Sequence, residues 1–262
     1  MRAYLLAPLA ALGLHARASQ ESTPDAAETL RTELERSGIR LDLARGVVAI
    51  PATVDVRGEL LEYLLVGPRG AAHESLLVTE VRPSLLNVAL LALGATPGRN
   101  ARWSLEGSGE GTERILPPEG DGFFLHVAWR EEQEVYFFRV EDLIANLASG
   151  CSMRRDRWVY LGSRMVDPAP AEGAAFVADL EENLINLTFF YQGNTLLTAA
   201  LPECVDQSIW IANSWLLPPR ESPVLLLLSR SPLERIPEGW ADSLPVVAPR
   251  AGTAEAATED GD

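Results

Sequence analysis

Short apolar runs, separated by turns, follow one another along most of the chain. From Ile39 to Leu43 apolar residues alternate with polar ones, and a turn ending at Gly46 leads into a second apolar run. Comparable runs recur at 60–66, 74–81, 123–129, 135–140, 158–163, 174–179, 184–190, 195–199, 208–212 and 224–229. Alternation with a period of two is typical of β-strands, and short polar connections favour antiparallel or mixed sheets over repeated β-α-β units.

Two stretches predict helices instead. Residues 21–38 place Leu30 and Leu34 four positions apart, begin with a capping threonine and a proline, and end at a glycine. Residues 83–93 begin with a proline and are almost continuously apolar up to a glycine. A helix that is apolar all round is a buried helix, so we expect this one to be a central element of the core.

The pattern as a whole predicts an α+β fold, mostly antiparallel or mixed β-sheet with one buried central helix. We expect four segments: a signal peptide at 1–18, a helical segment at 19–38, one α+β domain at 39–231, and a tail at 232–262. The tail contains prolines and ends in a small, acidic stretch without apolar periodicity, which predicts disorder.

The first residues have the parts of a secretory signal peptide. Arg2 supplies a positive charge, 3–14 form an apolar run, and Ala16-Arg17-Ala18 is a small-x-small motif, so cleavage is expected after Ala18. The apolar run is shorter than the roughly 20 residues that a membrane-spanning helix needs. We therefore expect an exported protein, periplasmic or extracellular, without a transmembrane helix.

The charge balance excludes several classes of function. The chain has 37 acidic and 22 basic residues, a formal net charge of −15 at pH 7, and every basic residue is an arginine. A surface this negative repels phosphate backbones, so we expect no nucleic-acid partner. The lack of lysine excludes a P-loop, a Schiff-base enzyme and a kinase-type site, and no cofactor is implied.

The sequence contains two cysteines, Cys151 and Cys204, which are the residues that could form a disulfide. In an oxidising compartment an isolated pair is most simply a disulfide, which is the prediction here. Two buried free thiols, or half of a metal site, are the alternatives. The sequence has no C-x-x-C motif, and a zinc site needs four ligands at constrained spacing.

The sequence His73-Glu74-Ser75 brings an imidazole, a carboxylate and a hydroxyl together at the start of a strand-like run. A histidine can act as a general base with a carboxylate as its partner. Neighbouring strand residues point to opposite faces, so in a regular strand His73 shares its face with Ser75 rather than with Glu74. A structural histidine bonded to a nearby carbonyl group is the alternative interpretation.

A second group of polar residues consists of Asp179, Glu181, Glu182 and Asn183, which we place at the tip of a hairpin. Oxygen ligands in a turn could hold calcium, an abundant ion outside cells. The EF-hand pattern is absent, however, because no glycine follows at the required position. A solvated polar turn, with no bound metal, is the favoured interpretation.

Four stretches carry a family resemblance: LEYLLV at 61–66, HESLLVTEVRPSLLNVALLALGATPG at 73–98, WVYLGSRMV at 158–166 and FVADLEENLINLTFF at 176–190. They resemble the YdjY-domain family, a group of exported bacterial proteins plentiful in planctomycete-type bacteria. The resemblance spans about 39–230 and implies no established reaction. Some members carry a ferredoxin-like name, but an iron–sulfur cluster needs about four thiolates, and this chain has two cysteines.

No complete catalytic constellation is recognisable, so the leading hypothesis is an exported, non-enzymatic binding or envelope-associated domain. An envelope protein or a small ligand is the candidate partner. The alternative is a hydrolase-like or metal-assisted enzyme centred on His73 and Glu74. Convergence of His73 with another ionisable group in a pocket would favour the enzyme.

Overall fold

The computed structural model describes residues 26–55, 60–104, 114–167, 173–192 and 194–248. The expected signal peptide with its cleavage position at Ala18, the expected helix cap at Thr23 and Pro24, and the acidic end of the chain from 249 lie outside these ranges. None of the helices within the described ranges has both the length and the apolar character needed to cross a bilayer.

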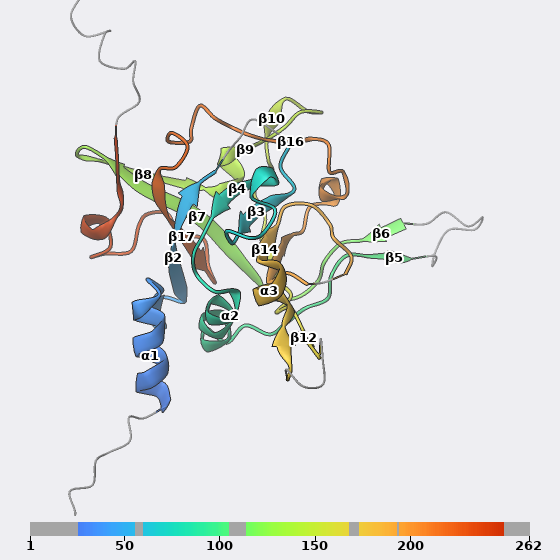
Figure 1. Ribbon diagram of the computed structural model, residues 1–262. Helices are drawn as coiled ribbons and strands as arrows, with labels where there is room; N and C mark the ends of the chain where they lie inside the picture. The colour runs from blue at the N-terminus through green and yellow to red at the C-terminus, as the bar shows by residue number, and fades with distance from the viewer. Residues whose placement is uncertain (1–25, 56–59, 105–113, 168–172, 193, 249–262) are drawn as a thin grey trace, which may run out of the picture.

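Eight strands form a closed barrel at the centre of the fold (Figure 1). In order around the barrel they are β2 (Val47–Val54), β17 (Pro223–Ser229), β7 (Gly122–Glu131), β11 (Trp158–Tyr160), β15 (Leu197–Ala199), β14 (Asn183–Asn186), β3 (Tyr63–Val66) and β4 (Ser75–Val78). The barrel closes because β4 pairs back onto β2, with Thr53 opposite Val78. The β3–β4 and β14–β15 pairs are parallel and the other neighbours are antiparallel, so the expected mixed sheet is confirmed.

Shorter elements surround the barrel. Its sheet is extended by β1 (Arg40–Asp42) beside β2 and by β8 (Glu134–Arg139) and β18 (Val246–Val247) beside β7. Small separate sheets pair β5 (Arg102–Ser104) with β6 (Arg114–Leu116), β12 (Met165–Val166) with β13 (Ala175–Phe176), and β9 (Ile144–Asn146) with both β10 (Cys151–Ser152) and β16 (Trp210–Ala212). The helices are α1 (Ala26–Arg36), α2 (Pro83–Ala92) and α3 (Val177–Glu181), with 3₁₀ turns η1 (Ala72–Glu74), η2 (Val140–Leu143), η3 (Pro202–Val205) and η4 (Ala241–Ser243).

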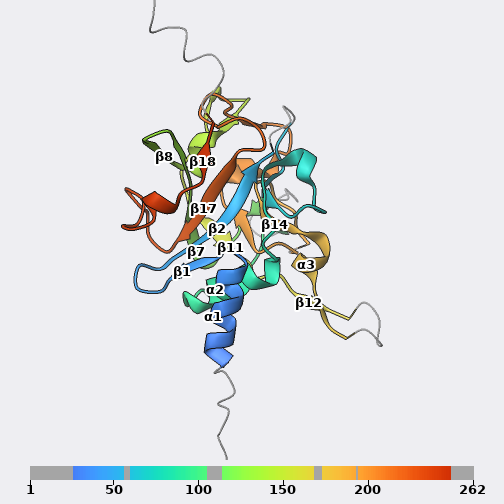
Figure 2. The same ribbon diagram turned by 60° about the vertical axis from the view of Figure 1, so that its left-hand side comes forward.

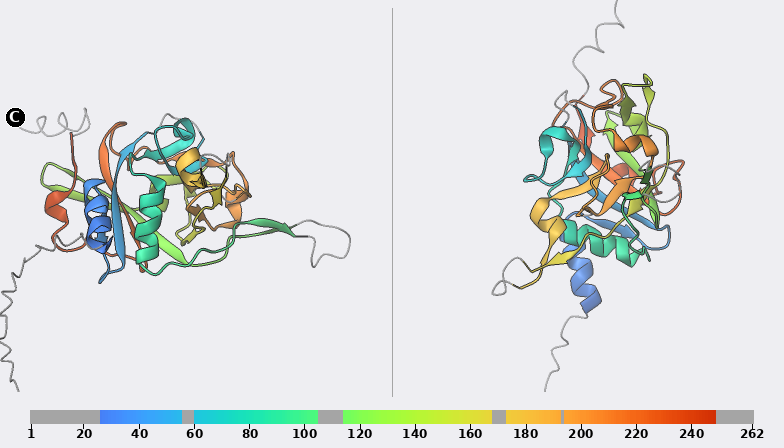
Figure 3. Two further views of the ribbon diagram at one scale, coloured as in Figure 1. Left: turned by 60° about the horizontal axis from the view of Figure 1, so that its bottom comes forward. Right: turned by 90° about the vertical axis from the view of Figure 1, so that its right-hand side faces the viewer.

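The helix expected at 83–93 is present as α2, but its expected central position is not confirmed. One face of α2 is buried, with Leu86 and Leu90 fully inaccessible, whereas Leu91 is 45% exposed. Figures 1 and 3 show α2 at one end of the barrel. The physical reason is that an eight-stranded barrel is just wide enough for the side chains of its own strands, so a helix packs against its end.

The outer face of β2 and β17 is apolar as well. Val47 and Ala49 of β2 and Leu225 and Leu227 of β17 belong to a second buried cluster, separate from the barrel interior. Residues 233–247, here called the C-terminal segment, cover these side chains with Leu244 and lie beside the strands in Figure 2. The expected disordered tail at 232–262 is therefore wrong over its first part, because these residues bury apolar surface against the sheet.

Candidate functional site

His73, Glu74 and Ser75 do not converge as a catalytic group. His73 lies in η1 rather than in a strand, with its side chain 60% exposed, and its Nε2 is 3.5 Å from Glu74 Oε1. Ser75 is buried, and its hydroxyl donates a hydrogen bond to the Leu77 carbonyl at 2.8 Å. His73 and Ser75 were expected to share a face only in a regular strand, and that condition is not met, because His73 lies in η1 and β4 begins at Ser75.

A residue that the sequence analysis missed, Glu62, lies beside Glu74. Tyr63 of β3 is the register partner of Ser75 in β4, so the preceding residues Glu62 and Glu74 are neighbours, and the Glu62 amide donates to the Glu74 carbonyl at 2.9 Å. Burial raises the pKa of Glu62, and the charge and side-chain hydrogen bond of Glu74 raise it further, against the opposing effect of His73. Glu62 and Glu74 could have been placed together only by knowing that β3 pairs with β4, and the sequence does not show that pairing.

Asp179 organises a helix instead of a hairpin tip. It lies in α3, and its Oδ1 accepts a hydrogen bond from the Ser84 amide at 2.7 Å. The residue before α2, Arg82, provides no side-chain cap, so the carboxylate of Asp179 satisfies an amide that the first turn of α2 leaves free. Asp179 thus stabilises the positive end of the α2 dipole.

The other three members of the acidic group also have protein partners. Glu182 accepts hydrogen bonds from the Arg69 amide and from its Nε, both at 2.9 Å, and Asn183 Oδ1 accepts one from the Ala71 amide at 3.1 Å. Glu181 accepts a hydrogen bond from the Asn194 side chain at 2.6 Å. Within the described ranges, no three His, Cys, Asp or Glu side chains are arranged to hold a metal ion. Glu182 and Asn183 hold the turn that precedes η1.

The predicted disulfide is wrong, because Cys151 and Cys204 are not bonded to each other. Cys204 lies in η3 and is fully buried in the main apolar core, and this burial raises the pKa of its thiol well above the usual range. Cys151 is exposed on β10, where its Sγ lies 3.6 Å from the Ser149 carbonyl. One thiol is committed to the core and the other faces solvent.

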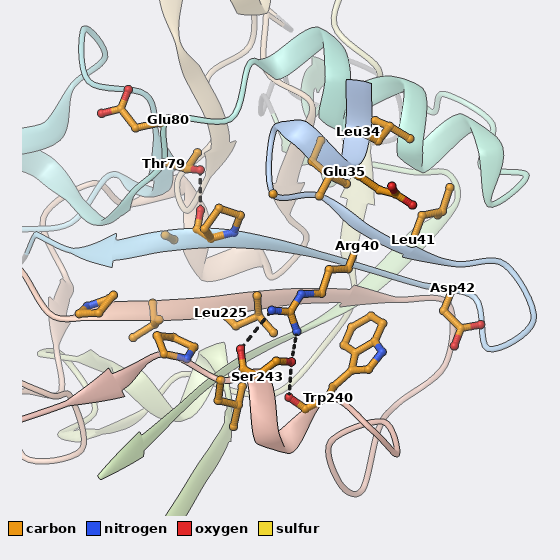
Figure 4. Close-up of a pocket in the computed structure, with 18 of the residues that line it drawn as sticks. Leu34, Glu35, Arg40, Leu41, Asp42, Thr79, Glu80, Leu225, Trp240 and Ser243 are labelled. Carbon is orange, nitrogen blue, oxygen red and sulfur yellow. Dashed lines mark hydrogen bonds between the residues drawn. The ribbon is translucent and has the colours of Figure 1, made fainter. Parts of the chain in front are cut away.

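A large groove lies on the outside of the barrel (Figure 4). Its volume is about 1450 Å³, and its walls come from α1, β1, the middle of β2, the start of β17 and the C-terminal segment. Apolar side chains supply most of the lining, namely Leu30, Leu34, Ile39, Leu41, Leu43, Pro51, Ala52, Val78, Ala92, Pro223, Val224, Leu225, Trp240, Leu244 and Pro245. Neither His73 nor Glu74 is among the lining residues. The groove continues the outer apolar cluster beyond the region that the C-terminal segment covers.

Polar contacts fix the walls of the groove. Figure 4 shows the Arg40 side chain reaching from β1 to Ser243, where it donates hydrogen bonds to Oγ at 2.6 Å and to the carbonyl at 3.1 Å. On the opposite side, the Thr79 hydroxyl donates to the Pro51 carbonyl at 2.7 Å. Glu80 at the rim has no ion-pair partner among the described residues. The groove is therefore preformed, and one carboxylate at its edge is available.

Comparison with known proteins gives one match. The family model of the YdjY domain matches residues 39–180, more than half of the chain. The chain belongs to the YdjY-domain family. No curated protein and no solved structure matches it.

The YdjY match covers only part of the groove. It runs from the start of β1 to α3, and it therefore includes the walls formed by β1, β2 and the residues after β4. The wall formed by β17 and the C-terminal segment lies beyond the matched range. Within this YdjY-domain protein, the groove thus joins the matched region to the part of the chain that follows it.

Proposed function

We propose that this chain is an exported, non-enzymatic binding domain of the cell envelope, and that it holds an apolar segment of a partner protein in the groove. The observation that carries the proposal is an open groove on the outside of the barrel that is lined mostly by apolar side chains. Leu43 in its wall is 63% exposed, and exposed apolar surface of this kind is typical of interaction sites.

The charges of the groove favour a basic flank on that partner segment. Arg31 pairs with Glu35 and Arg40 is held by Ser243, so both arginines of the lining are engaged. No free cation among the described lining residues remains to bind the carboxylate or phosphate of a lipid. Glu80 is available, and the net charge of −15 attracts basic segments.

Peptide binding tests this proposal. The probe is a labelled synthetic peptide of about twelve Leu, Ala and Ser residues flanked by arginines, with a second peptide carrying glutamates instead. Leu43→Asn replaces apolar surface of the groove by a neutral amide at an exposed turn, so it should weaken binding of the arginine peptide by about tenfold without unfolding the protein. Leu147→Asn is the matched control, since Leu147 is 54% exposed and lies outside the groove lining.

Fluorescence anisotropy with the purified chain gives the outcome. Tighter binding of the arginine peptide than of the glutamate peptide, weakened in Leu43→Asn and unchanged in Leu147→Asn, supports the proposal. Equal binding by both variants, or preference for the glutamate peptide, contradicts it.

Export has its own test. Positive Arg2, the apolar run at 3–14 and the motif ending at Ala18 support cleavage before Ser19. N-terminal sequencing of the protein recovered from the periplasm or medium of a bacterial host should begin at Ser19. Recovery of a chain that still begins at Met1 argues against export by this route.

The second candidate is the hydrolase-like or metal-assisted enzyme, which the Glu62–Glu74 carboxyl pair beside His73 favours. A carboxyl group whose pKa is raised, as that of Glu62 is, can act as a general acid. Hydrolysis of p-nitrophenyl esters by the purified chain, abolished in His73→Ala with an unchanged melting temperature, would establish this candidate. Absence of hydrolysis, or a loss of melting temperature that parallels the loss of rate, would exclude it for ester substrates.

A further inference from the structure

A second cavity, here called the polar pocket, is separate from the groove and shares no lining residue with it. Its volume is about 500 Å³, and residues from β3, α3, β14 and the stretches 189–192 and 194–195 line it together with Gln207. Amides, hydroxyls and aromatic rings make up most of the lining, including Tyr63, Asn186, Phe190, Tyr191 and Thr195. Glu181 is the one charged side chain among the described residues that line it.

The lining of the polar pocket contains one buried polar atom that has no hydrogen-bond partner among the described residues. Asn186 in β14 is 4% exposed, and its Oδ1 has no hydrogen-bond partner among the described residues. Its register partners are Tyr63 on β3 and Thr198 on β15, and the buried Thr198 hydroxyl also lacks a described partner. Tyr63 and Asn186 both line the polar pocket, whereas Thr198 shares a face with Asn186 in the regular β14–β15 pairing but is not a lining residue. Leaving such groups unsatisfied costs free energy, and this is a common feature of ligand sites.

Tyr63, Phe190 and Tyr191 are aromatic residues of the lining, and Trp103 lies outside the lining against Tyr191. Tyr63 stacks on Phe190 with ring centroids 5.0 Å apart, and Tyr191 packs against Trp103 of β5 at 5.7 Å. Trp103 is 54% exposed and Tyr191 is 38% exposed, so two large rings lie in solvent beside a polar cavity. Aromatic faces bind the C–H surfaces of sugar rings, while amides both donate and accept hydrogen bonds with hydroxyls.

We propose that the polar pocket binds a neutral saccharide, with a sugar ring over Trp103 and Tyr191 and its hydroxyls directed to the amides of the pocket. The lining has no arginine, so it offers no partner for a uronic acid or a sugar phosphate, and Glu181 repels both. The polar pocket and the groove share no lining residue, so this inference stands apart from the peptide-binding proposal.

Calorimetric titration of the purified full chain tests the inference. The probes are cellotetraose and chitotetraose as neutral saccharides and tetragalacturonate as the anionic comparison, each at up to about 10 mM. At least one neutral probe should bind, and Trp103→Ala should weaken that binding about tenfold because it removes an exposed ring. Trp215→Ala is the matched control, since Trp215 is 87% exposed and, unlike Trp103, has no described ring contact with a residue that lines the polar pocket.

Each outcome decides the matter. Binding of a neutral probe that Trp103→Ala weakens and Trp215→Ala leaves unchanged supports a saccharide site at the polar pocket. No binding of either neutral probe, equal effects of the two tryptophan variants, or strongest binding of tetragalacturonate overturns the inference. Trp103 lies in a short exposed strand, and circular dichroism of the variant verifies that its fold is retained.

Discussion

Acidification should destabilise the protein through one buried imidazole, that of His126 in β7. The side chain is 1% exposed, stacks on Phe137 with ring centroids 4.9 Å apart, and faces Arg139 on β8 as its register partner. Burial and then the positive charge of Arg139, with a smaller effect of Arg155, lower the pKa of His126 to about 4. The main-chain groups around the ring act in the opposite direction, but less strongly.

The sign and size of the effect follow from this pKa. The unfolded chain binds a proton at His126 near pH 6.5, whereas the folded chain binds it only near pH 4. Above pH 6.5 both states are neutral at this residue and the folded state keeps its full stability. As the pH falls from 6.5 to 4 the unfolded state is stabilised, and a difference of roughly 2.5 pKa units corresponds to about 3 kcal/mol of unfolding free energy.

Urea denaturation at pH values from about 7.5 to 4 measures this loss. His126→Phe keeps an aromatic ring against Phe137 and removes the proton site, so its unfolding free energy should fall less with acid than that of the wild type. His73→Gln is the control, because it removes an imidazole that is exposed. The carboxyl groups titrating in the same range are common to all three proteins, so the differences between them isolate each histidine. Indistinguishable pH dependence in the wild type and His126→Phe would refute the argument.

Three further outcomes are expected. Leu86→Ala should lower the unfolding free energy by about 2–5 kcal/mol because Leu86 is fully buried. Leu91→Ala, on the exposed face of α2, should change it by no more than about 0.5 kcal/mol. Equal effects of the two variants in urea denaturation would contradict the burial of only one face of α2. Asp179→Ala should cost about 0.5–2 kcal/mol by uncapping α2, and an unchanged melting temperature would argue against that role. Thiol labelling of the native protein, followed by mass spectrometry, should modify Cys151 alone, and Cys204 should react only after denaturation. A native protein in which neither cysteine has a free thiol would support the disulfide after all.

Local patterns predicted the eight barrel strands and the second helix because each depends on neighbouring residues, but the strand-like run at 174–179 ends in the helix α3. The proline at position 83 and the glycine at position 94 bracket α2, which spans Pro83–Ala92, within one residue of the expected 83–93. The apolar character of 83–93 was misinterpreted as burial on every side. Contact with a barrel end buries one face, and Leu91 remains exposed despite its chemistry.

The pairing between strands that are distant in the sequence could not be predicted from local patterns, for a physical reason. Closure of the barrel through Thr53 and Val78, and the parallel pairing of Tyr63 with Ser75, depend on the geometry of the whole sheet. Without those pairings, Glu62 could not be placed beside Glu74. The disulfide prediction failed in the same way, because it used compartment and count, whereas the burial of Cys204 depends on tertiary packing.

The groove shows where sequence reasoning could have gone further. Residues 47–50 and 224–228 are apolar at consecutive positions, and strands with two apolar faces need a cover on each side. The barrel interior covers one face, and the C-terminal segment covers the other only in part. The Arg40–Ser243 hydrogen bond, between residues 203 positions apart, fixes where the cover lies. The apolar outer face of the sheet is larger than the area that the C-terminal segment covers, and the uncovered part forms the groove. The exposed Leu43 lies where a partner segment could cover the rest of this face.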